Sequence, residues 1–184
     1  MKKRASFFTK NQRGQIWVET VIYTLIALVM IGLVLAFARP KIQELQDKAV
    51  IDQSITMLKE IELTVLDLSG GAGNQRIFEL GMKKGELKID GVNDKIIFEM
   101  ESAYTYSEPG ETINDGSLLV HTETQGNINI ITLTRDYSSS YNLKYNELDE
   151  LGTLTKSSIP YRLLLKNEGE DVDTGDTIID IGVI

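Results

Sequence analysis

The side chains that most often perform catalysis are nearly absent from this 184-residue sequence, which contains no Cys and a single His, His121. The lack of Cys excludes a disulfide framework, a thiol nucleophile, a cysteine zinc site and an iron–sulfur centre. One His cannot form a His-rich metal cluster, and no supporting residues for a Ser-His-Asp triad are evident. His121 alternates with Val120 and Thr122 in a strand-like stretch, which favours an ordinary sheet residue. We therefore expect no enzymatic activity and no cofactor.

Three acidic residues near the C-terminus resemble a calcium loop in composition only. Asp171, Asp173 and Asp176 surround Gly175. An EF-hand loop places its Gly at the sixth position and closes with a bidentate Glu, whereas Gly175 is fifth and no Glu follows at the closing position. We expect a solvated turn between the last two strands and no metal site.

Charge is distributed unevenly along the chain, whose formal net charge is −8 and whose pI is about 4.8. Residues 1–14 contain no acid and five basic residues: Lys2, Lys3, Arg4, Lys10 and Arg13. This start carries +5, so the remainder carries −13. Affinity for a phosphate backbone comes largely from clustered Lys and Arg. An acidic body of this kind excludes nucleic acid as an expected partner.

Residues 21–38, VIYTLIALVMIGLVLAFA, form an uncharged run of 18 residues. This is close to the ~20 apolar residues that a helix needs to cross a bilayer. Apolar residues occur all round the helical wheel, which favours a membrane segment over the one-sided pattern of a core helix. The basic residues that precede the run predict a cytoplasmic start and an external body for the 146 residues that follow.

Glu19 lies at the threshold of this apolar run. A carboxylate at the bilayer centre costs roughly 2.5–3.5 kcal/mol, so such a residue often marks a role, although at the edge it can reach the headgroups instead. A secretory signal peptide has a shorter apolar core of about 7–15 residues, which argues against cleavage after residues 36–38, AFA. An uncleaved signal anchor explains the length and the orientation but not Glu19.

The residues around Glu19 carry a resemblance to a known family. The segment 10–19, KNQRGQIWVE, resembles the class III signal peptide of type IV pilins, especially the archaeal ones. Those proteins have a short basic leader, a Gly at the cleavage point, a mature N-terminus that is already hydrophobic, and Glu as its fifth residue. The resemblance implies that Gly14 is the last leader residue and Gln15 the first mature one. Trp17 departs from the family, which often has a smaller residue there.

This arrangement also has a physical rationale. Gly14 has no Cβ to clash when an extended backbone enters a membrane-embedded protease. Removing the leader removes five positive charges that hold the helix to the cytoplasmic face. The new α-ammonium group of Gln15 can then pair with Glu19 of a neighbouring subunit, cancelling two charges that are costly to desolvate. A wrong axial register would leave both unpaired, so the pair would fix the register of assembly.

The apolar pattern continues beyond the membrane segment as an amphipathic helix over residues 39–68. Its apolar positions follow mostly three- or four-residue steps: Ile42, Leu45, Ala49, Ile51, Ile55, Leu58, Ile61, Val65 and Leu68. Pro40 lies inside this helix and is expected to kink it. A helix over residues 16–68 would be about 80 Å long, so its N-terminal half must contact lipid or other subunits. Residues 69–74, SGGAGN, are expected to end it.

After residue 74 the sequence becomes β-prone, with short runs separated by turn residues. The expected strands are residues 76–80, 86–89, 95–101, 118–124, 127–137, 161–166 and 177–183, while residues 141–151 fit either a strand or a short helix. We predict an α+β fold: a long N-terminal α-helix, with a membrane-spanning half (15–38) and an amphipathic half (39–68), followed by a C-terminal antiparallel β-sandwich-like domain over 75–184.

The resemblance implies a structural subunit, major or minor, of an archaeal type IV pilus-like filament. Its partners would be other copies of itself or other pilins, prepilin peptidase, an assembly ATPase and a membrane platform protein. The subunit would lie in the cytoplasmic membrane, with its β-domain outside, before it joins an extracellular filament. The main alternative is an uncleaved single-pass protein whose extracellular β-domain binds a surface partner. A weaker alternative is a membrane-bound enzyme with a carboxylate site.

Overall fold

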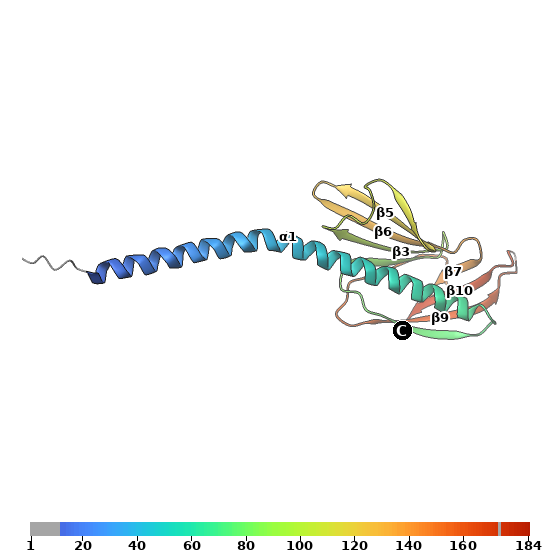
Figure 1. Cartoon of the computed structure of the whole chain (residues 1–184). Coiled ribbons are helices and arrows are strands. Elements are labelled where there is room, and N and C mark those ends of the chain that lie inside the picture. The colour runs from blue at the N-terminus through green and yellow to red at the C-terminus, as the bar shows by residue number, and fades with distance from the viewer. Residues whose placement is uncertain (1–11, 173) are drawn as a thin grey trace, which may run out of the picture. The chain divides into compact units, whose positions relative to one another are not determined.

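The computed structural model describes residues 12–172 and 174–184, with side chains from Trp17 onward. Helix α1 spans Gln12–Leu68 and is followed by β-strands (Figure 1). The strands are β1 (Gln75–Leu80), β2 (Glu86–Asp90), β3 (Lys95–Ser102), β4 (Thr112–Asp115), β5 (Leu118–Gln125), β6 (Ile128–Asp136), β7 (Tyr141–Tyr145), β8 (Leu151–Thr155), β9 (Tyr161–Glu170) and β10 (Thr177–Val183). The chain divides into two compact units, Met1–Ile42 and Gln43–Ile184. The predicted leader, residues 1–14, falls mostly outside the described residues.

The C-terminus of α1 lies at Leu68, where the sequence predicts it. Gly73 follows with a φ of 82°, the left-handed backbone that favours glycine after a helix. Asn167 of β9, which is buried, completes the cap, because its Nδ2 donates to the Leu68 carbonyl at 2.9 Å. The Asn167 carbonyl also accepts a bond from the Gly73 amide at 2.8 Å. The end of the helix is therefore fastened to a strand that begins almost a hundred residues later.

The strands form two sheets. One has the order β1-β9-β10-β7, and the other has the order β4-β5-β6-β3-β2-β8. Neighbouring strands are antiparallel in both, except that β10 and β7 are parallel, with Thr177 opposite Tyr141. The α+β class is therefore confirmed, while the expectation of a wholly antiparallel domain is wrong for this one pair. The difference arises because β7 joins the sheet beside β10, which lies more than thirty residues later in the chain, rather than beside a hairpin neighbour.

Each of the seven expected strands is present, and the structure adds three that the sequence left unassigned. β4 is short, exposed and polar (TIND), so it lacks the apolar alternation that marks a half-buried strand. The ambiguous stretch 141–151 consists of β7, a turn and the start of β8. Asn146 and Glu147 lie in that turn with φ values of 51° and 66°. The turn lets Tyr145 form an isolated bridge with Leu148.

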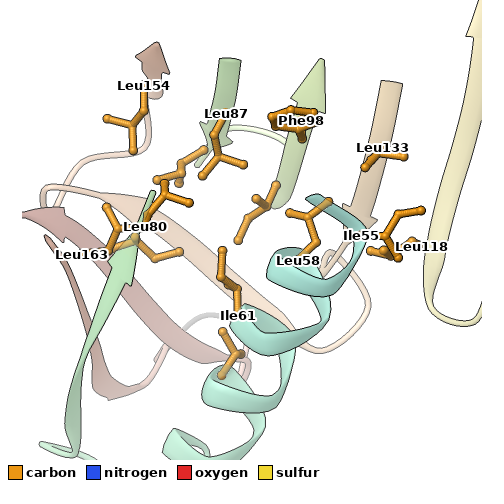
Figure 2. Close-up of a cluster of buried hydrophobic side chains, with 14 of the residues drawn as sticks. Ile55, Leu58, Ile61, Leu80, Leu87, Phe98, Leu118, Leu133, Leu154 and Leu163 are labelled. Carbon is orange, nitrogen blue, oxygen red and sulfur yellow. The ribbon is translucent and has the colours of Figure 1, made fainter. Parts of the chain in front are cut away.

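One hydrophobic core joins α1 to both sheets (Figure 2). The buried stripe of α1 comprises Ile51, Ile55, Leu58, Ile61, Val65 and Leu68. These side chains meet Leu87, Phe98 and Leu133 of the six-stranded sheet and Leu80 and Leu163 of the four-stranded sheet. The compact unit consequently begins at Gln43, and its strands share their core with the helix.

The N-terminal end of the predicted amphipathic stripe does not reach this core. Ile42 and Leu45 are 53% and 65% exposed, and Ala49 is exposed as well. The buried face instead begins at Asp47 and Ile51, which are one helical turn apart. Sequence periodicity identified the stripe but extended it by about two turns, because it cannot tell which apolar residues find a partner.

Leu58 tests the contribution of α1 to the core. Replacing Leu58, which is 1% exposed, with Ala should lower the free energy of unfolding by about 2–5 kcal/mol, because it removes buried apolar surface and leaves a cavity. Leu63 provides a matched control on the same helix, since it is 65% exposed, and Leu63→Ala should change stability by less than about 0.5 kcal/mol. Urea unfolding of the full chain in detergent micelles, followed by circular dichroism, measures both. Equal effects would contradict a shared core.

Candidate membrane and assembly segment

The N-terminal part of α1 presents apolar side chains that the subunit does not cover. Every side chain from Trp17 to Phe37 is exposed. None of its most apolar 18-residue stretch is buried within the subunit. By length and composition this helix is able to cross a membrane.

Leaving this apolar surface in water has a large unfavourable free energy. Burying a large aliphatic or aromatic side chain stabilises a structure by about 1.5–3 kcal/mol. The exposed set includes Trp17, Leu25, Leu28, Ile31, Leu33 and Phe37, together with most of the Val, Ile and Met residues between them. Their combined transfer free energy exceeds the roughly 5–15 kcal/mol by which a domain is stable. Such a surface is compatible with a covering of lipid or of other protein.

Glu19 is exposed and lies on α1 just before the uncharged run. Gly14 and Gln15, the predicted cleavage pair, lie within the helical backbone of α1, but the structure does not describe their side chains. Gln15 and Glu19 are four residues apart, which is about one helical turn, so they share a face of α1. This spacing brings the α-nitrogen of a subunit that begins at Gln15 and the Glu19 carboxylate to the same part of the helix.

Pro40 lies inside α1, which continues as helix on both sides of it. Because proline lacks an N–H, the carbonyl of the preceding turn loses its helical partner at this position. The two compact units meet two residues later, between Ile42 and Gln43. The kink expected at Pro40 stays a prediction.

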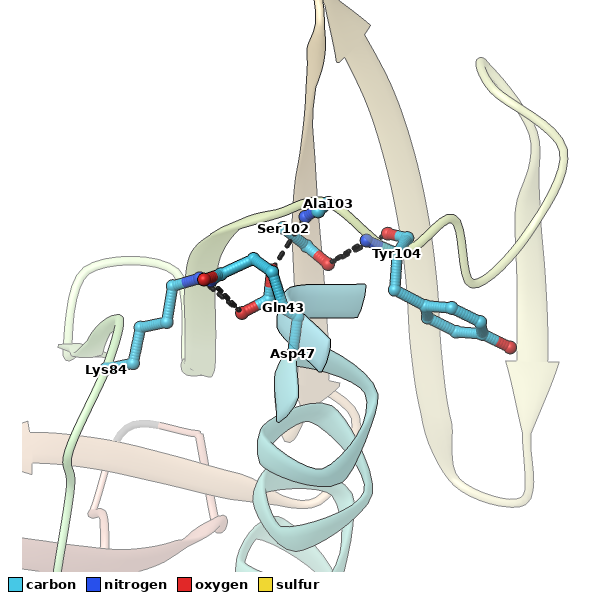
Figure 3. Close-up of polar contacts among 6 residues, drawn as sticks. All are labelled: Gln43, Asp47, Lys84, Ser102, Ala103 and Tyr104. Carbon is cyan, nitrogen blue, oxygen red and sulfur yellow. Dashed lines mark hydrogen bonds and ion pairs between the residues drawn. The ribbon is translucent and has the colours of Figure 1, made fainter. Parts of the chain in front are cut away.

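The first turns of α1 in the second unit are tied to the strands by a buried carboxylate (Figure 3). The side chain of Asp47 is 2% exposed, and its two oxygens accept hydrogen bonds from three groups. Lys84 Nζ donates to Asp47 Oδ1 at 2.5 Å, and Gln43 Nε2 donates to the same oxygen at 3.2 Å. The Ala103 amide donates to Asp47 Oδ2 at 2.7 Å. Beside it, Ser102 Oγ and the Tyr104 backbone bond to each other, closing the loop that holds Ala103.

Two further ion pairs connect α1 to the six-stranded sheet. Lys59 Nζ lies 2.9 Å from Asp115 Oδ1 at the end of β4, and Glu62 lies 3.0 Å from Arg135 of β6. The Lys59 ammonium, with a smaller contribution from the Tyr106 hydroxyl, holds the pKa of Asp115 below its ordinary value. These partly exposed pairs contribute little individually, but they fix which face of the helix meets the sheet.

The remaining candidate residues lie in the sheets and in a turn between strands. His121 lies on β5, and its Nδ1 is 3.0 Å from Thr112 Oγ1 of β4, so it is a sheet residue as expected. Asp171 and Asp176 close the turn between β9 and β10, where the Asp171 amide donates to the Asp176 carbonyl at 2.8 Å. Asp173 lies outside the described residues. Within the described ranges, no group of three or more His, Asp or Glu side chains is arranged to hold a metal ion.

Sequence reasoning missed two residues that anchor α1, Asp47 and Asn167. Asp47 could have been recognised from the sequence, because it lies four residues before Ile51 and eight before Ile55, on the buried face of an amphipathic helix. A lone acid on such a face predicts a buried partner. The role of Asn167 could not have been recognised from the sequence, because it depends on β9 passing the end of α1.

Comparison with known proteins adds no assignment. The sequence matches no family model and no curated protein, and no solved structure matches it.

Asp47 tests the anchoring of the helix. Asp47→Ala should lower the free energy of unfolding by about 1–3 kcal/mol, because the Ala103 amide loses its acceptor and Lys84 loses the buried carboxylate that it pairs with. Asp52, which is exposed one turn later, is the matched control, and Asp52→Ala should change stability by less than about 0.5 kcal/mol. Urea unfolding in micelles measures both variants. If Asp47→Ala leaves the free energy of unfolding unchanged, apolar packing alone positions the helix.

Proposed function

We propose that this protein is a structural subunit of a type IV pilus-like surface filament, without enzymatic activity. The observation that carries the proposal is the division of α1: one half shares a core with the strands, while the other exposes an uncharged apolar surface. A contact between identical subunits that does not close into a ring generates a helical filament. Packing of exposed helices against one another would cover the apolar surface and build such a filament.

Glu19 and the leader support this proposal over a simple anchor. A membrane anchor needs only apolar length, and an acid at its edge adds nothing to it. In the proposed filament, the Glu19 carboxylate of one subunit pairs with the Gln15 ammonium of another once the leader has been removed after Gly14. Buried ions of opposite charge are costly when separated, so the pair favours one axial register. Prepilin peptidase, an assembly ATPase and a platform protein are the proposed machinery.

In the proposed life cycle, the unassembled subunit is inserted in the cytoplasmic membrane, and residues 43–184 lie outside the cell. The basic leader favours this orientation, since cytoplasmic flanks carry an excess of Lys and Arg. Residues 43–184 then form the outer surface of the filament. If the leader is retained, the alternative function is that of a single-pass anchored protein whose external unit binds a surface partner.

Processing at Gly14 is the first test. The wild-type protein extracted from membranes should have the mass of a chain that begins at Gln15, whereas Gly14→Leu should retain the leader because a bulky Cβ substituent obstructs the protease. Gly32→Leu is the matched control within the same helix, where an added Cβ meets no atom within 4 Å, and it should be processed normally. Intact-mass spectrometry distinguishes the forms. A wild-type protein that keeps residues 1–14 would contradict the proposal.

Assembly through Glu19 is the second test. Glu19→Ala should leave membrane insertion and processing intact, because it makes the helix more apolar, but it should weaken subunit addition by roughly 10- to 100-fold because the neighbour's ammonium is left unpaired. Sheared filaments and membrane-bound subunits are measured separately by immunoblotting. Glu123→Ala, which removes an exposed acid from β5, is the control and should assemble normally. Normal filament yield from Glu19→Ala would make Glu19 an interfacial residue only.

A further inference from the structure

Two loops of the second unit concentrate positive charge in an acidic body. Residues 43–184 contain 12 basic and 26 acidic residues, a net charge of −14. The loop at 81–85, GMKKG, and the segment 156–162, KSSIPYR, which is a loop that continues into the first two residues of β9, contain four of those basic residues and no acid. A third of the unit's cations thus lies in twelve of its residues. Charge of one sign gathered on a body of the other sign marks a surface for a partner of opposite charge.

The two loops lie side by side. The Ser157 amide donates to the Met82 carbonyl at 2.9 Å. The loops line an open cavity of about 540 Å³ whose walls are Gly81, Met82, Lys83, Lys156, Ser157, Ser158 and Pro160. Lys83 and Lys156 thus reach the same part of the surface.

The cations of this surface differ in how far they are neutralised. Lys83 and Lys156 are exposed, and among the described residues neither has an ion-pair partner. Lys84 is bound to Asp47, and Arg162 lies opposite Glu79 in the β1–β9 pair. Glu86, Glu99 and Glu101 line the adjacent groove with Lys156, and the first two of these glutamates are paired with Lys88. Two lysines therefore remain available to an external anion.

An exposed apolar side chain accompanies these lysines. Ile159 is 77% exposed and lies between Ser158 and Pro160, which both line the cavity. Lysines near an exposed apolar residue suit a surface that contacts the membrane interface, where the ammonium groups reach phosphates and the apolar residue enters the acyl boundary.

Chain length limits how far this surface can be from a membrane that holds the apolar run. Lys84 bonds to Asp47, which follows Ala38, the last residue of the run, by nine helical residues. Nine residues of helix span about 14 Å, and a bend at Pro40 can only shorten that distance. The headgroup region extends roughly 5–8 Å beyond the hydrocarbon. A lysine side chain is long enough to cover most of the distance that remains between this part of the second unit and the headgroup region.

We propose that the surface formed by Lys83, Lys156 and Ile159 docks on anionic lipid headgroups of the outer leaflet and holds the second unit against the membrane before assembly. This inference rests on the membrane anchoring in the proposed function, but not on leader cleavage or on filament formation. Each lysine should raise the ratio of docked to undocked subunits by roughly five-fold, since a basic residue near an anionic surface has about that effect. The remaining acidic surface is repelled, so docking selects one orientation.

The absence of Cys allows a direct test with the full chain, because one introduced Cys carries a fluorophore at a single site. Ser158→Cys places the label on the docking surface. Val172→Cys places it in the exposed turn after β9, a ten-residue strand that spans about 33 Å. The protein is inserted into phosphatidylcholine nanodiscs that carry a headgroup nitroxide quencher, with or without phosphatidylglycerol. The label at residue 158, but not that at 172, should be quenched, and phosphatidylglycerol should strengthen the quenching.

Charge variants separate docking from simple proximity. Lys83→Gln with Lys156→Gln should lower the docked ratio by roughly 25-fold, and raising the salt concentration should lower it in the parent. Lys95→Gln with Lys166→Gln removes the same charge from strands β3 and β9 and should leave docking unchanged. Equal quenching at both labels, or quenching that ignores both phosphatidylglycerol and the lysine changes, would overturn the proposal.

The outcome is distinguishable from failure of the proposed function. Co-elution of protein with the nanodisc measures anchoring, and a chain that does not co-elute would overturn both anchoring and docking. Glu19→Ala should dock normally even where it fails to form filaments. If the subunit does not dock but forms normal filaments, the docking proposal is overturned and the proposed function is not.

Discussion

The apolar side chains of α1 are more stable out of water, and the subunit supplies a covering for only some of them. From Ile51 to Leu68 the strands of both sheets cover one stripe. From Trp17 to Phe37 apolar residues occur all round the helix and are exposed. Burial is favourable in proportion to apolar area, so both parts seek a covering, but only the first finds it within one chain. That difference is the basis for the proposal that a membrane or neighbouring subunits cover the N-terminal part of α1.

Apolar burial has no direction, so polar bonds at the two ends of the buried half fix the position of the helix along its axis. Asp47 at one end accepts the Ala103 amide and pairs with Lys84, and Asn167 at the other end caps Leu68. A slip by one turn would leave these buried groups unpaired, at a cost of about 1–3 kcal/mol each. In a filament held together by its helices, these two anchors would transmit load between helix and strands.

Electrostatics divides the surface in a way that complements the apolar pattern. The second unit is strongly acidic, which keeps it soluble and disfavours contact with anionic surfaces. The exception is the pair of loops that carries Lys83 and Lys156. These loops are far apart in the sequence, but a hydrogen bond between Ser157 and Met82 joins them. The proposed docking surface and the proposed assembly helix would thus use different physical forces.

The sequence by itself determined the features that depend on local pattern. The end of α1 at Leu68, seven of the strands and the stripe from Ile51 to Leu68 all follow from periodicity and turn residues. Gly14, Gln15 and Glu19 are also visible only in the sequence, and their roles remain predictions. The tertiary structure decided what depends on residues far apart in the chain: the parallel pairing of β7 with β10, the cap from Asn167 and the meeting of the two basic loops. Local pattern cannot reveal these, because a residue's own neighbours do not record which distant strand passes beside it.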